Sequence, residues 1–390
     1  MMKVIGSFLN KYKNILNICC LFAVLFLLTG CAQRQGIKEF EVDENTSLAS
    51  EQPLEIVDNA YADEFLIKRY EKGYSVIEVS DGRKYLLVPE GIAIPKDFNE
   101  YTIIKKNVNR IYLAGTSVMS LFDSLNILDN ISFSSQKKED WYIENAQIKM
   151  TEGKIVYAGK YSSPDFELLI NDGCNLAIES TMILHKPDIL EKLEELGIPV
   201  FIERSSYEKN PLGRLEWIKV YGEMCGCFDD AEAFFEEQCK KIAKLVLAGT
   251  DEKTVAFFYM NQNGMVVTKK SSDYVPKMIS MAGGKYILED IGDDEQALSS
   301  VNMTMEDFFV LAKDADFIIY NGTITDAPED IQSLIEKSEL LADFKAVKDR
   351  NVYCMNKSVY QESSQTADII KAINNMLNEK SNDLLYKLEG

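Results

Sequence analysis

The chain has 390 residues, of which 46% are hydrophobic and 27% are charged, and its formal net charge at pH 7 is −20. This length and apolar content provide material for two or three folded domains, whereas the acidic balance argues against a protein that tracks nucleic-acid phosphates. The sequence holds a single histidine, His185. Most zinc sites, histidine-based catalytic triads and His-rich metal-capture sites are therefore excluded.

The first thirty residues form a predicted targeting segment. A lysine-containing start precedes an apolar run over residues 15–28, which ends at Leu28-Thr29-Gly30-Cys31. This ending resembles a bacterial lipobox, in which cleavage leaves the cysteine N-terminal and lipid-modified. The apolar run is shorter than the ~20 residues of a membrane-spanning helix. We therefore expect a lipoprotein signal peptide over 1–30 and lipidation at Cys31, with an uncleaved membrane anchor as the alternative.

The remaining cysteines show no metal-binding spacing. Their odd number leaves at least one thiol free unless cysteines pair between chains. We interpret them as small buried residues or an incidental disulfide. They are Cys174, Cys225, Cys227, Cys239 and Cys354.

Residues 31–60 are polar and acidic without a period, which is typical of a flexible tether. Organised structure is expected from about Tyr61. The alternating segments 74–79 and 84–88 flank Asp81-Gly82 and predict a β-hairpin, which we expect to be a small decoration before the main fold.

Strands then alternate with helices, which predicts a parallel sheet with crossover connections. The first strand, Ile111–Gly115, leads into a helix at Val118, and Ser117 occupies the position of a helix N-cap. Ligands of such sheets bind beyond the carboxyl ends of the strands. Further strands are expected at 155–159, 176–180 and 198–202, with a helix over 187–196 that ends at Gly197.

The stretch 201–222 is dense in charged and aromatic residues around Asn210-Pro211 and Gly213, and predicts a loop that lines a cleft. The strongest helix pattern follows, with acids at its start and lysines toward its end. A second α/β set runs from Thr254 to the C-terminus.

The predicted fold class is α/β, with two Rossmann-like lobes joined by one long helix and a small N-terminal β-hairpin decoration. The predicted domains are a signal peptide (1–30), a tether (31–60), an N-terminal lobe (61–228), an inter-lobe helix (229–249) and a C-terminal lobe (250–390).

Short motifs occur in a fixed order along the chain. They are Leu28–Cys31, Ile111–Ser117, Pro164–Ser180, Lys186–Asp188, Leu196–Val200, Ala282–Gly284, Met305–Glu306 and Phe344–Tyr353. Together these motifs resemble one family, the extracytoplasmic solute-binding lipoproteins of ABC importers of the iron–siderophore, haem and cobalamin type. The resemblance spans roughly Arg110 to the C-terminus, and the lipobox is its most specific part.

The resemblance implies one docking glutamate on each lobe, and by position these are Glu167 and Glu306. Each opens a short apolar segment that leads to a strand, so both also have an ordinary explanation as acids at a helix start. The implied partners are an ABC permease dimer with its ATPase, a chelated-iron or corrinoid-like small molecule, and the membrane through Cys31. The expected location is extracytoplasmic and lipid-anchored.

The expected ligand site lies between the lobes, with aromatic rings that cover a flat ligand and arginines that hold its oxygens. The structural alternative is that Arg204 pairs with Glu203 or Glu208 and Arg214 with Glu216. Trp217 is then a core residue. No protein-bound metal or cofactor is expected, although the ligand itself can carry a chelated metal. The candidates are Ser117, Trp141, Tyr142, Tyr161, Arg204, Arg214 and Trp217.

Two other classes stay open. The first is a membrane-tethered hydrolase that uses a pair of carboxylates. The spacing of the 62 acids does not single out such a pair, and no G-x-S-x-G nucleophile motif occurs. A lipoprotein adhesin or scaffold would not need two matching α/β halves. The sequence therefore favours a binding protein over an enzyme.

Overall fold

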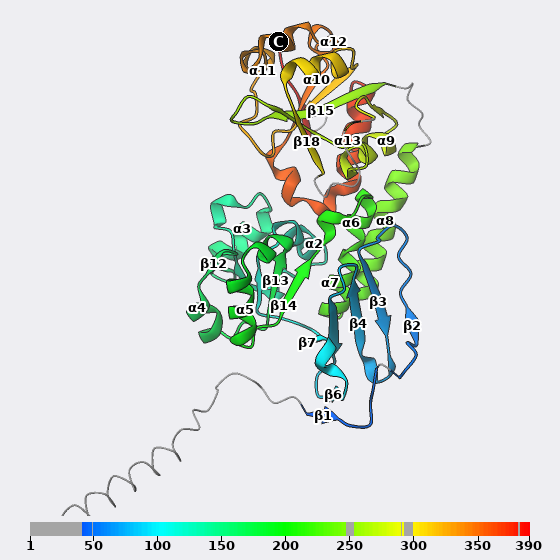
Figure 1. Cartoon of the computed structure of the whole chain (residues 1–390), viewed down its shortest axis with the longest axis vertical. Coiled ribbons are helices and arrows are strands. Elements are labelled where there is room, and N and C mark those ends of the chain that lie inside the picture. Colours follow the sequence, from blue (N-terminus) through cyan, green and yellow to red (C-terminus); the bar gives the residue numbers. More distant parts are fainter. Residues whose placement is uncertain (1–40, 49, 247–252, 290, 292–298, 381–382) are drawn as a thin grey trace, which may run out of the picture. The chain divides into compact units, whose positions relative to one another are not determined.

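The computed structural model describes residues 41–390 except 49, 247–252, 290, 292–298 and 381–382. The predicted signal peptide and Cys31 lie outside the described residues. Among the described helices, none has both the length and the apolar character that crossing a membrane requires. Residues Glu41–Gly390 form one unit, which Figure 1 shows as two α/β lobes with an additional sheet.

The additional sheet comes first in the chain and has the order β2-β3-β4-β5-β7. The predicted hairpin is confirmed as β4–β5, with Gly82 in its turn at φ 92°. It is the centre of a five-stranded sheet rather than a small decoration, because two flanking segments extend the pairing on either side. The strands are β2 (Glu55–Ile56), β3 (Phe65–Arg69), β4 (Ser75–Val79), β5 (Lys84–Val88) and β7 (Thr102–Lys105).

The predicted tether over 31–60 is ordered in its second half. Strand β1 (Val42–Asp43) pairs in parallel with β6 (Ile94–Pro95), and β2 pairs with β3. Leu48 and Val57 are buried at 3% and 4% exposure. Their packing partners lie far along the chain, so the local composition did not reveal them.

The N-terminal lobe is a parallel sheet in the order β10-β9-β8-β13-β14, as the alternating pattern predicted. Helices α4 and α5 lie over the sheet face that carries Tyr112 and Ala177, where a separate hydrophobic cluster forms that includes Leu193 of α5. Its strands are β8 (Ile111–Leu113), β9 (Ile131–Ser134), β10 (Val156–Tyr157), β13 (Leu176–Ser180) and β14 (Val200–Glu203), with the short pair β11 (Gly159–Lys160) and β12 (Ser163–Pro164). Its helices are α2 (Met119–Ser124), α3 (Glu144–Thr151), α4 (Phe166–Asn171) and α5 (Pro187–Glu195).

The polar stretch 201–222 is mostly helical rather than a loop. Pro211 occupies the first turn of α6 (Pro211–Glu216), where its missing N–H costs nothing, and the Asn210 side chain accepts the N–H of Leu212 as the N-cap. Helix α7 (Ile218–Cys225) follows and ends at Gly226, whose φ of 77° needs glycine. The predicted turn residues therefore start a helix that is largely buried.

The long inter-lobe helix is confirmed as α8 (Phe228–Val246). The last residues of the prediction, 247–249, lie outside the described residues. Asp229 and Asp230 stand in its first turn and Lys244 in its last, as the helix dipole favours. In Figure 1, α8 runs along both lobes, and α13 (Thr366–Leu377) packs beside it.

The C-terminal lobe has a seven-stranded sheet in the order β18-β16-β15-β19-β20-β21, with β17 also paired to β15. Strands β15, β17, β19 and β20 are parallel, and β16 and β21 run against their neighbours. The strands are β15 (Thr254–Met260), β16 (Val266–Lys269), β17 (Lys285–Tyr286), β18 (Ser300–Met303), β19 (Phe317–Tyr320), β20 (Val352–Met355) and β21 (Leu385–Lys387). The other helices are α9 (Tyr274–Met281), α10 (Met305–Ala312), α11 (Ile331–Lys337) and α12 (Lys345–Lys348).

Candidate functional site

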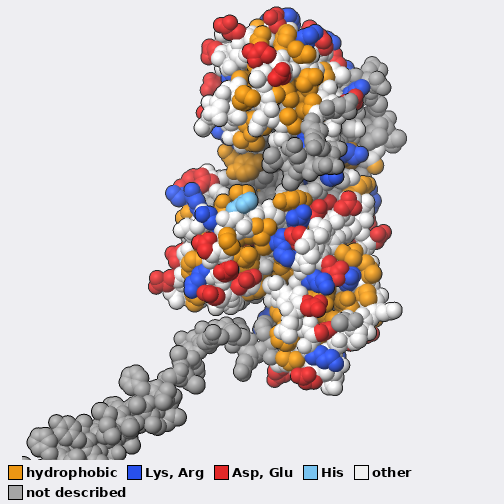
Figure 2. Space-filling view, viewed as in Figure 1, with side chains coloured by type: hydrophobic (Ala, Val, Ile, Leu, Met, Phe, Trp, Pro, Cys, Tyr) orange, Lys and Arg blue, Asp and Glu red, His pale blue; other side chains and the backbone are white. Residues whose placement is uncertain are grey.

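Large hydrophobic side chains are exposed just beyond the carboxyl ends of strands in both lobes. Ligands bind beyond this edge in parallel sheets, and grouped exposed apolar side chains mark interaction sites. Figure 2 shows hydrophobic side chains gathered where the two lobes meet. We call the following six residues the strand-end surface. They are Tyr142 (46% exposed), Met182 (49%), Leu184 (47%), Tyr207 (45%), Ile324 (60%) and Tyr360 (45%).

The six members of the strand-end surface follow five strands, three in the N-terminal lobe and two in the C-terminal lobe. Tyr142 comes after β9, Met182 and Leu184 come directly after β13, and Tyr207 follows β14. In the other lobe, Ile324 follows β19 and Tyr360 follows β20. The two sets meet at the rings of Tyr142 and Tyr360, whose centroids are 6.2 Å apart at an interplanar angle of 80°. The strand-end surface therefore includes residues of both lobes.

Three of the predicted ligand residues lie at or near this edge. Tyr142 belongs to the strand-end surface, Tyr161 is half-buried against the cluster around Tyr112, and Ser117 is half-buried after β8. The predicted capping role of Ser117 is wrong: the 3₁₀ helix η3 (Thr116–Val118) has Gly115 as its N-cap and no side-chain cap. Ser117 instead accepts the Ser120 hydroxyl at its carbonyl oxygen.

The two tryptophans lie in the core instead of a cleft. Trp141 is 1% exposed and donates its indole N–H to Ser134 Oγ at 3.1 Å. Trp217 is 0% exposed, packs edge-on against Phe65 at 5.1 Å, and donates to Glu208 Oε1 at 3.0 Å. Since both indole N–H groups and both rings have protein partners, neither ring faces a ligand in this structure.

The two predicted arginine anchors also have protein partners. Arg204 Nε donates to Glu64 Oε2 at 2.6 Å, and its guanidinium lies 3.8 Å above the centroid of the Tyr207 ring. Arg214 donates to the carbonyl oxygen of Ser206 at 2.6 Å and stacks on Tyr274 at 3.5 Å. Arg204 thus pairs with an acid of the additional sheet instead of Glu203 or Glu208. A ligand held by either arginine would have to replace these contacts.

Three buried carboxylates on or near α6 and α7 bind the additional sheet. Glu208 accepts the backbone N–H groups of residues 63 and 64, and Glu216 accepts those of residues 60, 61 and 62. Glu223 accepts hydrogen bonds from Arg69, Ser75 and Lys106. Two of these acids, Glu208 and Glu216, are among the charged residues that suggested a ligand loop at 201–222. The hydrogen bonds of all three acids instead attach this part of the chain to the additional sheet.

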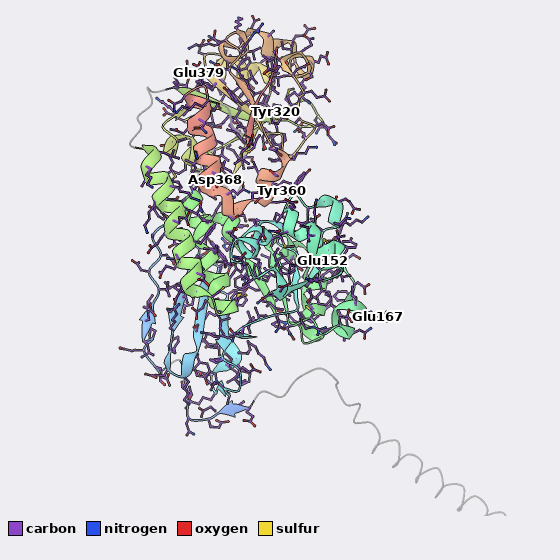
Figure 3. The ribbon with its side chains drawn as sticks, turned by 180° about the vertical axis from the view of Figure 1, so that it is seen from behind. Glu152, Glu167, Tyr320, Tyr360, Asp368 and Glu379 are labelled. Carbon is purple, nitrogen blue, oxygen red and sulfur yellow. The ribbon has the colours of Figure 1, made fainter. Side chains whose placement is uncertain are left out.

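The predicted docking glutamates are both exposed in the first turns of helices. Glu167 lies on α4 and Glu306 on α10, and each helix feeds a central strand of its sheet, β13 and β19. This arrangement confirms that both residues are helix-start acids. Figure 3 shows Glu167 on the N-terminal lobe, away from Tyr360. Their role toward a permease stays a prediction.

Two further acids are buried at the ends of neighbouring strands. Glu203, the last residue of β14, accepts the Ser205 N–H at 2.8 Å, and burial raises its pKa. Glu179 on β13 is 0% exposed, and neither carboxylate oxygen has a hydrogen-bond partner. Burial raises the pKa of Glu179 to about 8. No sequence pattern indicates this burial, because it depends on side chains that are distant from Glu179 along the chain.

A cavity of about 1060 Å³ is lined by residues of both halves of the chain. Its lining combines residues 59–63 and 209–210 with residues of α9 and β17. The charged side chains are three lysines and three acids, so its chemistry is more polar than that of the strand-end surface without an excess of either charge. They are Lys209, Lys277, Lys285, Asp63, Asp273 and Glu289. Its volume is in the upper range of small-molecule sites.

Within the described residues, no three His, Cys, Asp or Glu side chains are grouped so that they could hold a metal ion. The five cysteines that follow Cys31 are all free, and no pair of them forms a disulfide. The prediction that the chain carries no cofactor is untested and stays a prediction.

Comparison with known proteins matches the family model of a periplasmic binding protein to residues 119–359. An uncharacterized lipoprotein of Methanocaldococcus jannaschii is 25% identical over 307 residues, which are 74% of this chain and 70% of that protein. A periplasmic binding protein from Veillonella parvula has a similar structure, with a TM-score of 0.59 and 18% identity over 78% of this chain and 98% of the other. A periplasmic heme binding protein from Pseudomonas aeruginosa has a TM-score of 0.57 and 15% identity over 72% and 98% of the two chains.

These findings confirm the predicted resemblance, and the family, together with relatives named lipoproteins, agrees with an extracytoplasmic location. The similarity of the solved structures extends over most of this chain, so they share its α/β fold. Because the family model covers more than half of the chain, this protein belongs to the periplasmic binding protein family.

Proposed function

We propose that this chain is the lipid-anchored substrate-binding protein of an ABC importer and captures an iron–siderophore, haem or corrinoid-like ligand between its lobes. The single observation that carries the proposal is the strand-end surface, which presents six exposed hydrophobic side chains from both lobes. Capture needs no bond making. The loaded protein then docks on a permease, with Cys31 as its lipid anchor.

The chemistry of the strand-end surface favours a large ligand with a flat or apolar face. Three of its members are tyrosines, whose rings stack on flat surfaces and whose hydroxyls bind polar edges. Met182 adds a flexible, polarizable side chain that adapts to an irregular ligand. Haem binding by a solved relative with this fold supports the same ligand class.

The ligand class is tested by titrating the purified protein with haemin, a ferric catecholate siderophore and cyanocobalamin. We expect one of these to quench tryptophan fluorescence, because Trp141 adjoins Tyr142 in the chain and such ligands accept excitation energy. Replacing Tyr142 and Tyr360 with alanine should weaken that ligand at least tenfold, whereas Tyr386→Ala on β21 should not. No response to all three ligands would overturn the ligand class and leave the family assignment intact.

Docking is tested by reversing the charges of Glu167 and Glu306 together to lysine. Exposed charges at an interface chiefly set orientation and encounter rate. We expect the double variant to lose ligand uptake by cells while its ligand affinity stays within twofold of wild type. Glu191→Lys, on the exposed side of α5, is the matched control. A loss of ligand affinity in the double variant would instead place these residues in the ligand site.

A further inference from the structure

One buried side-chain amide joins the two lobes. Gln361 is 0% exposed and belongs to the 3₁₀ helix η9 (Lys357–Gln361) of the C-terminal lobe. Its Oε1 accepts the backbone N–H of Tyr142 at 2.8 Å, and its Nε2 donates to the carbonyl oxygen of Asp140 at 2.8 Å. The amide therefore pairs with the backbone of the other lobe as a strand would, through one donor and one acceptor.

The same amide also contacts the second tyrosine of the inter-lobe pair. Gln361 Nε2 lies 2.8 Å from the hydroxyl of Tyr360, to which it donates. The Gln361 side chain thus binds the backbone of Tyr142 and the hydroxyl of Tyr360. Figure 3 shows Tyr360 at the end of the C-terminal lobe that faces the N-terminal lobe.

Two further contacts belong to the same junction. The backbone N–H of Ser364 donates to Ser120 Oγ on α2 at 3.2 Å, and this bond is buried. The helices η3 and η9 also touch each other across the lobes. The junction therefore lies where the loops after β8 and β9 meet the loop after β20, which is the floor of the strand-end surface.

Only a group with one donor and one acceptor at this spacing satisfies both backbone partners. A carboxylate at position 361 would accept from Tyr142 but would face the Asp140 carbonyl oxygen without a proton. A leucine would leave both backbone groups, which are partly buried at this contact, without their side-chain partner. A protonated glutamic acid, in contrast, has the donor and the acceptor that glutamine has.

We propose that Gln361 is a positioning residue that sets the two lobes in register and fixes the Tyr142–Tyr360 pair as one wall of the ligand site. The proposal rests on the proposed function for the role of the two rings. The registration of the lobes rests on the two backbone hydrogen bonds alone, so the two parts can be tested separately.

The test compares wild type with Gln361→Glu and Gln361→Leu, using hydrogen exchange of the full-length protein. At pH 8 we expect the protection factor of the Tyr142 amide to fall at least tenfold in both variants. Below about pH 5 it should return toward the wild-type value in Gln361→Glu and stay low in Gln361→Leu. This pH-dependent rescue distinguishes the hydrogen-bond pattern from simple packing. Gln332→Glu, exposed on α11, is the control.

Other acids titrate at this junction, so wild type is measured over the same pH range. Burial, with a contribution from Asp123 on α2, raises the pKa of Glu362 to about 7, and Asp140 adjoins the contact. These groups are present in every variant, so the wild-type profile and the Gln361→Leu profile measure their own contribution to the pH dependence. Equal Tyr142 protection in Gln361→Leu and wild type at pH 8 would overturn the proposal.

The ligand arm uses whichever of haemin, ferric catecholate siderophore or cyanocobalamin binds wild type. We expect the affinity of Gln361→Glu to fall at least fivefold at pH 8 and to recover with the same pH profile as the protection factor. Unchanged affinity despite lost protection would overturn the positioning role. If none of the three binds wild type, the proposed ligand class fails, whereas the exchange arm still decides the registration of the lobes.

Discussion

Replacing Glu216 with alanine is expected to lower the free energy of unfolding by more than about 4 kcal/mol. Glu216 is 0% exposed and accepts three backbone N–H groups at 2.8–2.9 Å, while Lys219 Nζ lies 3.0 Å from its Oε1. The alanine variant leaves these donors and a buried ammonium without their acceptor. Removing one partner of a buried ion pair alone costs about 3–5 kcal/mol.

The measurement is urea unfolding at pH 7, followed by circular dichroism and by tryptophan fluorescence. Trp217 adjoins Glu216 and packs on Phe65 of the additional sheet, so its emission reports on the docking of that sheet. The control is Glu236→Ala on α8, where the pair with Lys240 is exposed and the change should leave the unfolding curve almost unaltered. A loss of under about 1 kcal/mol in Glu216→Ala would show that the carboxylate is not needed to hold the sheet.

The contacts of Glu216 also show why the stretch 201–222 was misread. Charged residues around Asn210-Pro211 are typical of a ligand loop, yet the partners of Glu216 lie more than 150 residues earlier in the chain. Sequence spacing reveals only near neighbours, so Glu208 and Glu203 seemed the natural partners of Arg204. One signal was available: Glu216, Lys219 and Glu223 recur at helical spacing within an otherwise apolar pattern. Such spacing places the three charged side chains on one side of the helical segment, where they can act together.

Elements with strong local signals were predicted well. The capped, amphipathic pattern of α8 and the alternation of strands with helices depend on neighbours within a few residues, and both are confirmed. Of the six residues of the strand-end surface, the sequence predicted only Tyr142 as a ligand residue. Met182, Ile324 and Tyr360 read as ordinary apolar residues, because their exposure depends on how the loops of two sheets face each other.

The acid Glu179 provides a second large effect, and its sign depends on pH. With a folded-state pKa of about 8 against an ordinary value of 4.5, the folded protein keeps a proton that the unfolded chain loses. The contribution of Glu179 to the free energy of unfolding is therefore greatest below about pH 4.5. It falls as the pH rises to about 8. At about 1.4 kcal/mol per pKa unit, the whole loss is on the order of 5 kcal/mol.

Glu179→Gln removes the charge while keeping the shape of the side chain. We expect this variant to match wild type within about 1 kcal/mol at pH 5, and to be more stable by a few kcal/mol at pH 9. Urea unfolding at the two pH values measures the difference. Glu167→Gln, an exposed acid on α4, should change the free energy of unfolding by less than about 0.5 kcal/mol at either pH.

A stability difference that is the same at pH 5 and pH 9 would show that Glu179 is already ionised in the folded protein and has found a partner. The expected pH dependence, in contrast, means that the N-terminal lobe holds a neutral acid at the end of its central strands. Such a group lies beside Ser180 and the loop that carries Met182. A ligand that supplied a positive charge or hydrogen-bond donors near Glu179 would stabilise its ionised form, so binding would release a proton near pH 7. Proton release on binding is measured by titration calorimetry in buffers of different ionisation enthalpy, and Glu179→Gln should abolish it.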